Sequence, residues 1–179
     1  MPAAAPPVVL VLASGRGERF LASGGQGSKL QALLAGKPVL EHTLAAVRAS
    51  GLPFHVEDAG HPGMGDSIAA GVRATADAGG WLVLPGDLPL VSPQSLRAVA
   101  AALEKATLVL PFYQGIRGHP VGFAREHGAA LQTLGGAEGA AAIVRASKPL
   151  RLDLDDPGIV TDIDIVDDLA RAEQQLRAR

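Results

Sequence analysis

The sequence of 179 residues contains no cysteine, few aromatic residues and no block of basic residues. Without cysteine it can form neither disulfides nor thiolate metal sites. Only 3% of the residues are aromatic, so Ala, Leu and Val must fill the core, for which 47% hydrophobic residues are ample. A net charge of -2 without Lys/Arg clusters argues against the basic face that nucleic-acid binding requires.

Long apolar runs are also missing. No stretch approaches the roughly 20 apolar residues that span a membrane. Residues 1–7 lack the basic start and the apolar run of a signal peptide. We therefore predict a loosely ordered tail over residues 1–7, a single domain over residues 8–179, no membrane partner and a cytoplasmic location.

A strand-like run from Val8 to Ala13 opens into a glycine-rich, basic loop that continues to Lys29. Glycines adopt positive φ and turn backbone N–H groups toward phosphate oxygens, while basic side chains supply charge. The loop fits neither G-x-x-x-x-G-K-[ST] nor G-x-G-x-x-G, because Phe20 stands where the third glycine belongs. A triphosphate-binding loop and a simple tight turn are therefore the two interpretations.

Short apolar runs alternate with helical patterns along the rest of the chain. We predict strands at residues 8–13, 54–57, 81–84, 107–110, 120–124 and 150–154, and helices at residues 38–50, 66–78 and 93–105. This alternation predicts a three-layer α/β/α fold with a mostly parallel, Rossmann-like sheet. Ligands of such sheets bind beyond the carboxyl ends of the strands, so the loops that follow strands carry the candidate site.

Asp87 lies in the second of these loops, directly after the strand predicted at residues 81–84. Proline, glycine and aspartate all favour turns, so Asp87 in Pro85-Gly86-Asp87 has one interpretation as a turn former. The next helix does not need Asp87 as a cap, because Ser92 precedes Pro93 and can accept the first free N–H groups. A ligand for a hard cation is the second interpretation.

The third loop lies in an acidic segment near the end of the sequence. Seven carboxylates from Asp153 to Asp168 repel one another unless a cation or solvent intervenes. Five are expected to be solvated acids at strand ends, loops and a helix start: Asp153, Asp155, Asp156, Asp167 and Asp168. Asp162 and Asp164 differ, because an extended chain points both to one face. A shared acidic face suits magnesium.

Together the three loops resemble the nucleotidyltransferases of molybdenum-cofactor maturation, the MobA-like family, and within it the molybdopterin cytidylyltransferase branch. The resemblance runs from Val8 to about Leu176. The matching segments are Leu12 to Phe20, Lys29-Leu30, Gly36 to Leu40, Pro62 to Ile68, Gly86 to Pro89, Arg117 to Val121 and Asp162 to Asp164. The resemblance implies a fold of the nucleotide-diphospho-sugar transferase type.

The resemblance also implies roles for individual residues. Lys29, Arg19 and Asp87 are the implied catalytic residues, and Asp87, Asp162 and Asp164 the implied ligands of Mg²⁺. The implied nucleotide-binding residues are Leu12, Ala13, Ser14, Gly15, Arg16, Gly17, Lys29, Gly63, Met64, Ser67 and Asp87. Arg117 and His119 would face the acceptor, with an ordinary loop histidine as the alternative for His119. The remaining histidines are expected to be structural or on the surface: His42, His55, His61 and His127.

The sequence departs from the family pattern in two places. Residues 22–27 lengthen the loop before Lys29, which favours a mobile lysine in the absence of ligand. Ile165-Val166 replaces the usual Thr-Pro after the last acidic segment, which changes how the last helix is anchored.

The implied reaction needs no covalent nucleophile. An acceptor phosphate attacks the α-phosphorus of a nucleoside triphosphate, by resemblance CTP, and pyrophosphate leaves. The implied acceptor is the terminal phosphate of molybdopterin or of its molybdenum-loaded form, and a molybdoenzyme or its chaperone is the implied protein partner. Two alternatives are a guanylyl- or sugar-1-phosphate nucleotidyltransferase, and a nucleotide-binding protein that delivers a cofactor without turnover.

Overall fold

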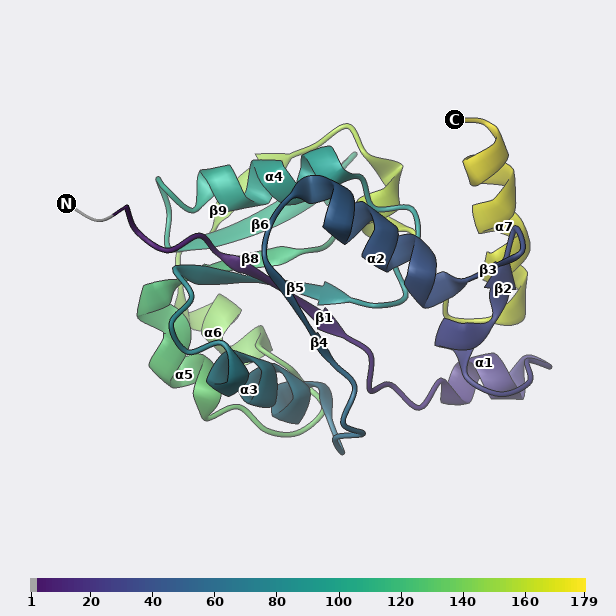
Figure 1. The fold of residues 1–179 in the computed structure, drawn as a ribbon, viewed down its shortest axis with the longest axis horizontal. Helices are drawn as coiled ribbons and strands as arrows, with labels where there is room; N and C mark the ends of the chain where they lie inside the picture. Colours follow the sequence, from purple (N-terminus) through teal and green to yellow (C-terminus); the bar gives the residue numbers. More distant parts are fainter. Residues whose placement is uncertain (1–2) are drawn as a thin grey trace.

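A seven-stranded sheet forms the centre of the structure (Figure 1). The computed structural model describes residues 3–179. The strands of this sheet are β1 (Val8–Leu12), β4 (Phe54–Glu57), β5 (Gly80–Pro85), β6 (Leu108–Tyr113), β7 (Ile116–Arg117), β8 (Val121–Ala124) and β9 (Leu150–Asp153). A separate antiparallel pair consists of β2 (Leu33–Leu34) and β3 (Lys37–Pro38).

Most of the strands run in one direction. β1 pairs in parallel with β4 and β5, and β6 pairs in parallel with β9. β8 lies between β5 and β6 and is antiparallel to both, while β7 forms a hairpin with β6. The predicted mostly parallel sheet is therefore confirmed. The sequence predicts a strand at residues 120–124 but not its direction, and in the structure this strand, β8, is antiparallel to its neighbours.

Helices cover both faces of the sheet. They are α1 (Glu18–Ala22), α2 (Val39–Ser50), α3 (Met64–Ala74), α4 (Pro93–Ala102), α5 (Gly128–Gln132), α6 (Ala141–Ala146) and α7 (Val166–Arg177), with 3₁₀ turns η1 (Lys29–Gln31), η2 (Arg125–His127) and η3 (Pro157–Val160). Figure 1 shows α2 and α4 on one face and α3, α5 and α6 on the other. The predicted three-layer α/β/α arrangement is confirmed.

The two main cores follow from the alternation of side chains along each strand. In β1, Val9 and Val11 pack with Leu44 and Leu96 in the core beneath α2 and α4. Leu10, between them in the sequence, packs in the opposite core, which includes residues of α3 and α5. An apolar run without polar alternation is thus a strand that is buried on both faces.

The ends of the predicted helices are set by local chemistry. α2 begins after Pro38 and ends at Gly51, whose φ of 74° lies in the left-handed region that favours glycine. The side chain of Ser92 caps α4 by accepting a hydrogen bond from the backbone N–H of Ser95, as predicted. α3 begins at Met64, two residues before the predicted start. It ends at Ala74, four residues before the predicted end, and a turn follows.

A third apolar cluster lies at the end of the sheet where α1, α7, β2 and β3 gather (Figure 1). Its buried residues come from three separate stretches of the chain and are Leu30, Leu34, Val39, Leu90, Ile163 and Ala172. Leu30 follows Lys29, and Ile163 separates Asp162 from Asp164. This cluster therefore holds in place the two segments that carry the candidate lysine and the candidate acidic pair.

Within residues 3–179, no helix combines the length and the apolar character needed to cross a bilayer. Residues 1 and 2 of the predicted tail lie outside the described residues, and residues 3–7 form no helix or strand. The backbone N–H of Gly79 donates a hydrogen bond of 3.1 Å to the carbonyl of Pro6. The division into a tail and one domain at residues 8–179 stays a prediction.

The structure corrects the expectation that Asp156 is a solvated acid. Its residue is only 7% exposed, and its carboxylate accepts hydrogen bonds from the backbone N–H of Ser92 and of Gly158, each at 2.9 Å. The Ser95 hydroxyl donates a further bond of 2.7 Å. The carboxylate therefore joins the start of α4 to η3. The sequence shows only an aspartate before Pro-Gly, so this distant partner could not be predicted.

We expect Asp156→Ala to lower the free energy of unfolding by about 3 kcal/mol, because it leaves buried donors without their charged acceptor. Asp155→Ala is the matched control, since Asp155 is exposed, and it should change stability by no more than about 0.5 kcal/mol. Urea unfolding followed by circular dichroism measures both. Equal stability of the two variants would contradict the structural role of Asp156.

Candidate active site

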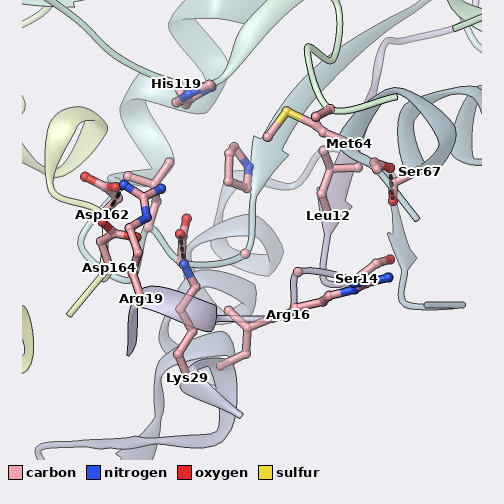
Figure 2. A pocket seen from close by; sticks show the side chains of 18 of the residues that line it. Leu12, Ser14, Arg16, Arg19, Lys29, Met64, Ser67, His119, Asp162 and Asp164 are labelled. Atoms are coloured by element: carbon pink, nitrogen blue, oxygen red, sulfur yellow. Dashed lines mark hydrogen bonds and ion pairs between the residues drawn. The ribbon is translucent and has the colours of Figure 1, made fainter. Parts of the chain in front are cut away.

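A cavity of about 630 Å³ opens at the carboxyl ends of β1 and β5 (Figure 2). Its lining includes most of the candidate site residues, namely Leu12, Ser14, Gly15, Arg16, Arg19, Lys29, Gly63, Met64, Ser67, Asp87, Arg117, His119, Asp162 and Asp164. Figure 2 shows Arg19, Asp162 and Asp164 on one side and Met64 and Ser67 on the other. The structure thus brings together residues from nearly the whole length of the sequence.

A second cavity of about 340 Å³ adjoins the first, and most of its lining is charged, with three basic residues and the acidic residues Glu18 and Asp164. Arg16, Arg19 and Lys29 border both cavities, as does Pro62. Gly17 borders only the smaller one, whereas Ala13, among residues 3–179, lines neither cavity. The basic end of the site is therefore distinct from the end lined by Met64.

The glycine loop is attached to two neighbouring strands. The backbone N–H of Ala13 and the hydroxyl of Ser14 both donate to the carbonyl of Glu57, at 2.9 and 3.0 Å. Gly17 has a φ of 62° and lies at the start of α1, a conformation that other residues rarely adopt. The glycine is therefore required by the turn that leads from the loop into α1.

Lys29 follows the lengthened loop and is paired with a carboxylate. It lies in η1, and its ammonium group is 2.8 Å from Oδ2 of Asp87. The two side chains are only 15% and 16% exposed, so solvent screens this pair less than a surface ion pair. The longer loop has not moved Lys29 away from the acidic end of β5.

Arg19 forms a second ion pair, with Nη1 2.9 Å from Oδ2 of Asp164. The Arg19 side chain is 80% exposed, so this pair is weaker and easily exchanged. Each of two candidate phosphate-binding cations is thus paired with a candidate metal-binding carboxylate.

The two departures from the family pattern meet in the structure. Ser23, in the lengthened loop, accepts a hydrogen bond of 2.9 Å from the backbone N–H of Val166 at the start of α7. Asp168 accepts two more from the backbone N–H groups of Asp164 and Ile165, each at 2.9 Å. The last helix is therefore anchored by Ser23 and Asp168 in place of the usual Thr-Pro.

Asp162 and Asp164 flank the fully buried Ile163, so their side chains point away from the core as the alternation predicts. The backbone N–H of Ile163 donates a hydrogen bond of 2.9 Å to the carbonyl of Asp87, which brings this segment against the end of β5. Partial burial, followed by the nearby Asp87 carboxylate, raises the pKa of Asp162. A carboxylate whose charge is disfavoured by a neighbouring carboxylate forms with that neighbour a donor set that fits a divalent cation.

The described residues 3–179 contain no cluster of three or more His, Asp or Glu side chains arranged to hold a metal. Magnesium needs only one or two protein carboxylates when substrate phosphates and water complete its shell. Asp87 and Asp162 meet that requirement in number, and Asp164 is a third candidate; Asp87 is paired with Lys29 and Asp164 with Arg19.

The segment from Gly63 to Ser67 forms the start of α3 and is held by a second glycine-rich loop. The backbone N–H of Gly65 donates to the carbonyl of Gly136 at 2.9 Å, and Asp66 accepts from the N–H of Gly136 at 3.1 Å. A Cβ atom on Gly63 would lie 2.5 Å from the Gly136 carbonyl oxygen. This close approach requires glycine and fixes the wall beside Met64.

His119 lies deep in the cavity, and Arg117 is more exposed. Burial, and then the positive charge of Arg117, lower the pKa of His119 from 6.5 to about 4. Nδ1 of His119 is a buried atom without a hydrogen-bond partner within the described part of the chain. At neutral pH the imidazole is therefore uncharged.

Several cavity residues were not predicted. His61 was expected to be structural or on the surface, but it lines the cavity and its Nε2 is 2.9 Å from Oε1 of Glu57. The signal that could have found it is Glu57, a charged residue that ends the strand Phe54–Glu57 four residues before His61. Other unpredicted lining residues, such as Ile116, Ala137 and Ile159, are apolar and carry no sequence signal.

Comparison with known proteins gives one family. The family model described as "MobA-like NTP transferase domain" matches residues 45–151. A 2-C-methyl-D-erythritol 4-phosphate cytidylyltransferase of Cereibacter sphaeroides is 34% identical over 128 residues, which are 57% of this chain and 56% of that protein. The chain thus spans little more than half the length of this curated relative.

Solved structures share the fold. Rv0371c of Mycobacterium tuberculosis has a TM-score of 0.77 at 22% identity, covering 96% of this chain and 99% of that chain. Its complex with manganese has a TM-score of 0.70 at 20% identity, covering 94% and 98%. Molybdopterin-guanine dinucleotide biosynthesis protein A of Archaeoglobus fulgidus has a TM-score of 0.69 at 20% identity, covering 96% and 99%. These likenesses confirm the α/β fold.

We expect the uncharged state of His119 to make folding sensitive to acid. Between pH 6.5 and 4 the unfolded chain binds a proton at His119 that the folded protein does not, so stability falls as the pH falls through this window. The loss amounts to about 3 kcal/mol at pH 4 relative to His119→Asn, which removes the titration. Chemical unfolding from pH 7 to 4 measures the difference. Arg117→Ala should reduce it, and parallel curves for wild type and His119→Asn would contradict the assignment.

Proposed function

This chain belongs to the MobA-like NTP transferase family, and on that premise we propose that it is a nucleotidyltransferase. In this proposal it transfers CMP from CTP to the terminal phosphate of a molybdopterin-type acceptor and releases pyrophosphate, in the cytoplasm. The observation that carries the proposal is the pairing of Lys29 with Asp87 inside a cavity at the carboxyl ends of β1 and β5. Such a pair offers a cation to phosphate and a carboxylate to a metal.

The layout of charges supports the orientation of the nucleotide. The smaller, basic cavity bordered by Arg16, Arg19 and Lys29 suits the β- and γ-phosphates. The wall at Met64 and Ser67 suits the base, which backbone groups from Leu12 to Gly15 would read. Ala13 acts in this arrangement only through its main chain, since its side chain lines neither cavity among residues 3–179.

Arg117 and His119 suit the acceptor side, because they lie on β7 and in the link to β8, on the part of the sheet beyond β5. An arginine there neutralises an incoming phosphate. The uncharged His119 adds hydrogen-bonding capacity without repelling a cation.

The proposed reaction forms a bond between an acceptor phosphate oxygen and the α-phosphorus, and it breaks the bond from the α-phosphorus to the β-phosphate bridge. The electron pair of the broken bond leaves with pyrophosphate. Lys29 and Arg19 stabilise the charge on pyrophosphate, and Asp87 with Asp162 would hold Mg²⁺, with Asp164 as an alternative ligand. When bound, Mg²⁺ polarises the phosphate and orients the attack.

A second compound class is a candidate for the acceptor. The 34% identical relative is named for cytidylyl transfer to a methylerythritol phosphate, and this favours CTP with a phosphorylated polyol as acceptor. The structural relative from Archaeoglobus fulgidus is named for a molybdopterin-guanine dinucleotide. Both names fit one cavity that takes a nucleoside triphosphate and a phosphorylated partner.

A pyrophosphate-release assay tests the function directly. With Mg²⁺ and molybdopterin we expect release from CTP at least about tenfold faster than from GTP, ATP or UTP, because a base-reading site leaves its polar groups unpaired with the wrong base. Asp87→Asn is the control for contaminating activity. Equal rates with GTP would contradict the nucleotide assignment. If the protein binds a nucleotide stably but releases pyrophosphate from none of them, with molybdopterin or with a phosphorylated polyol as acceptor, the cofactor-delivery alternative is favoured.

Lys29→Ala separates the two roles of the ion pair. We expect kcat to fall about 100-fold or more, because a preorganised cation is lost where pyrophosphate departs. The affinity of the ligand-free protein for Mn²⁺ should rise instead, because Asp87 is released from its partner. Isothermal titration and turnover measure the two effects, with Arg48→Ala, which breaks a surface pair with Glu41, as control. Near-normal kcat, or weaker Mn²⁺ binding, would contradict the exchange of partners at Asp87.

A further inference from the structure

Glu57 connects two histidines that the proposed reaction does not use. It ends β4, its residue is 8% exposed, and its carboxylate oxygens lie 3.0 Å from Nε2 of His55 and 2.9 Å from Nε2 of His61. Burial alone would raise the pKa of Glu57, but the hydrogen bonds from both histidines outweigh burial and lower it. The carboxylate is therefore ionised at neutral pH.

The ionised carboxylate determines which nitrogen of His61 carries the proton. A carboxylate only accepts hydrogen bonds, so Nε2 of His61 must donate. In a neutral imidazole the other nitrogen, Nδ1, is then an acceptor. Glu57 thus fixes both the tautomer and the orientation of His61.

His61 lines the larger cavity, and the residues that follow it border both ends of the proposed nucleotide site. Its neighbour Pro62 borders the basic cavity, and Met64, two residues later, lines the wall assigned to the base. The main-chain carbonyl of Glu57 also holds Ser14, at the point where the base-reading part of the loop meets its phosphate-binding part. The group of a nucleotide that lies between base and phosphates is the ribose.

We propose that His61 accepts a hydrogen bond from a ribose hydroxyl through Nδ1, and that Glu57 is the positioning residue that makes this possible. This inference rests on the proposed nucleotidyltransferase function. It makes the site selective for ribonucleotides, because a deoxyribose leaves the acceptor on His61 without its donor. His55 shares the carboxylate but lies outside the cavity lining found among residues 3–179.

Changes to the ligand test the contact without any mutation. Titration calorimetry at pH 8 with Mg²⁺ compares CTP with 2′-deoxyCTP and 3′-deoxyCTP. We expect one deoxy analogue to bind the wild type about 5- to 10-fold more weakly than CTP, the effect of one hydrogen bond. His61→Ala should weaken CTP by the same factor and leave that analogue unchanged. His61→Phe, which keeps the ring volume, should do the same.

The positioning role of Glu57 has its own control. Glu57→Leu should bring the affinity ratio of CTP to the deoxy analogue close to one, as His61→Ala does. His55→Asn alters a contact to the same carboxylate away from the cavity, and it should keep the wild-type ratio. Thermal unfolding verifies that each variant is folded. A ratio that falls equally in His55→Asn and Glu57→Leu would overturn the positioning role.

The remaining outcomes are decisive as well. If wild type prefers CTP and His61→Ala keeps that preference, the ribose contact is overturned while the proposed function stands. If His61→Ala weakens CTP and both analogues equally, His61 acts on the base or the phosphates and the inference is again overturned. If wild type binds none of the four nucleoside triphosphates, the proposed function fails and this inference fails with it.

Discussion

The site depends on two residues at the carboxyl end of β5, Gly86 and Asp87. The backbone N–H of Gly86 donates to Leu12 at 2.9 Å, and its carbonyl accepts from the Thr43 hydroxyl at 2.8 Å. A Cβ atom on Gly86 would lie 3.0 Å from the Leu12 carbonyl oxygen, so no larger residue fits without movement. Asp87 then holds Ile163 through its carbonyl and Lys29 through its carboxylate. Loops that are far apart in the sequence meet here because these two consecutive residues bind Leu12, Thr43, Lys29 and Ile163.

Much of the fold could be predicted because β1, β5 and β6 are apolar runs bounded by turns, while β4 and β9 alternate apolar and polar residues. β4 and β9 match their predicted ranges to within one residue. β7 has two residues, α5 and α6 have five and six, and segments this short carry no readable period. The antiparallel direction of β8 is set by its pairing with β5 and β6, and the sequence of a strand does not show which strands it will pair with. The burial of Asp156 was missed for the same reason, since its partners lie some sixty residues away.

Candidate site residues could be predicted from the sequence where a charged residue follows the end of a predicted strand. Asp87 and Asp162 were singled out because they stand after an apolar strand and in an alternating acidic segment, and Lys29 because it ends the glycine-rich loop that resembles the family pattern. Whether they carry the proposed roles stays a prediction. His61 was missed because a histidine in a loop gives no sign of its tautomer or direction. That information lies in its contact with Glu57, which depends on how the loop after β4 folds back.

The pairing of cations with carboxylates also affects how a charged ligand finds the cavity. Four cationic side chains, Arg16, Arg19, Lys29 and Arg117, share the lining with three carboxylates, Asp87, Asp162 and Asp164. At distances beyond a Debye length these charges nearly cancel, so the cleft projects little field into solution. A triphosphate, the proposed ligand, would then not be drawn in by long-range attraction. Its association rate should depend only weakly on ionic strength, and selectivity develops at contact, when each ion pair opens and its members turn to new partners.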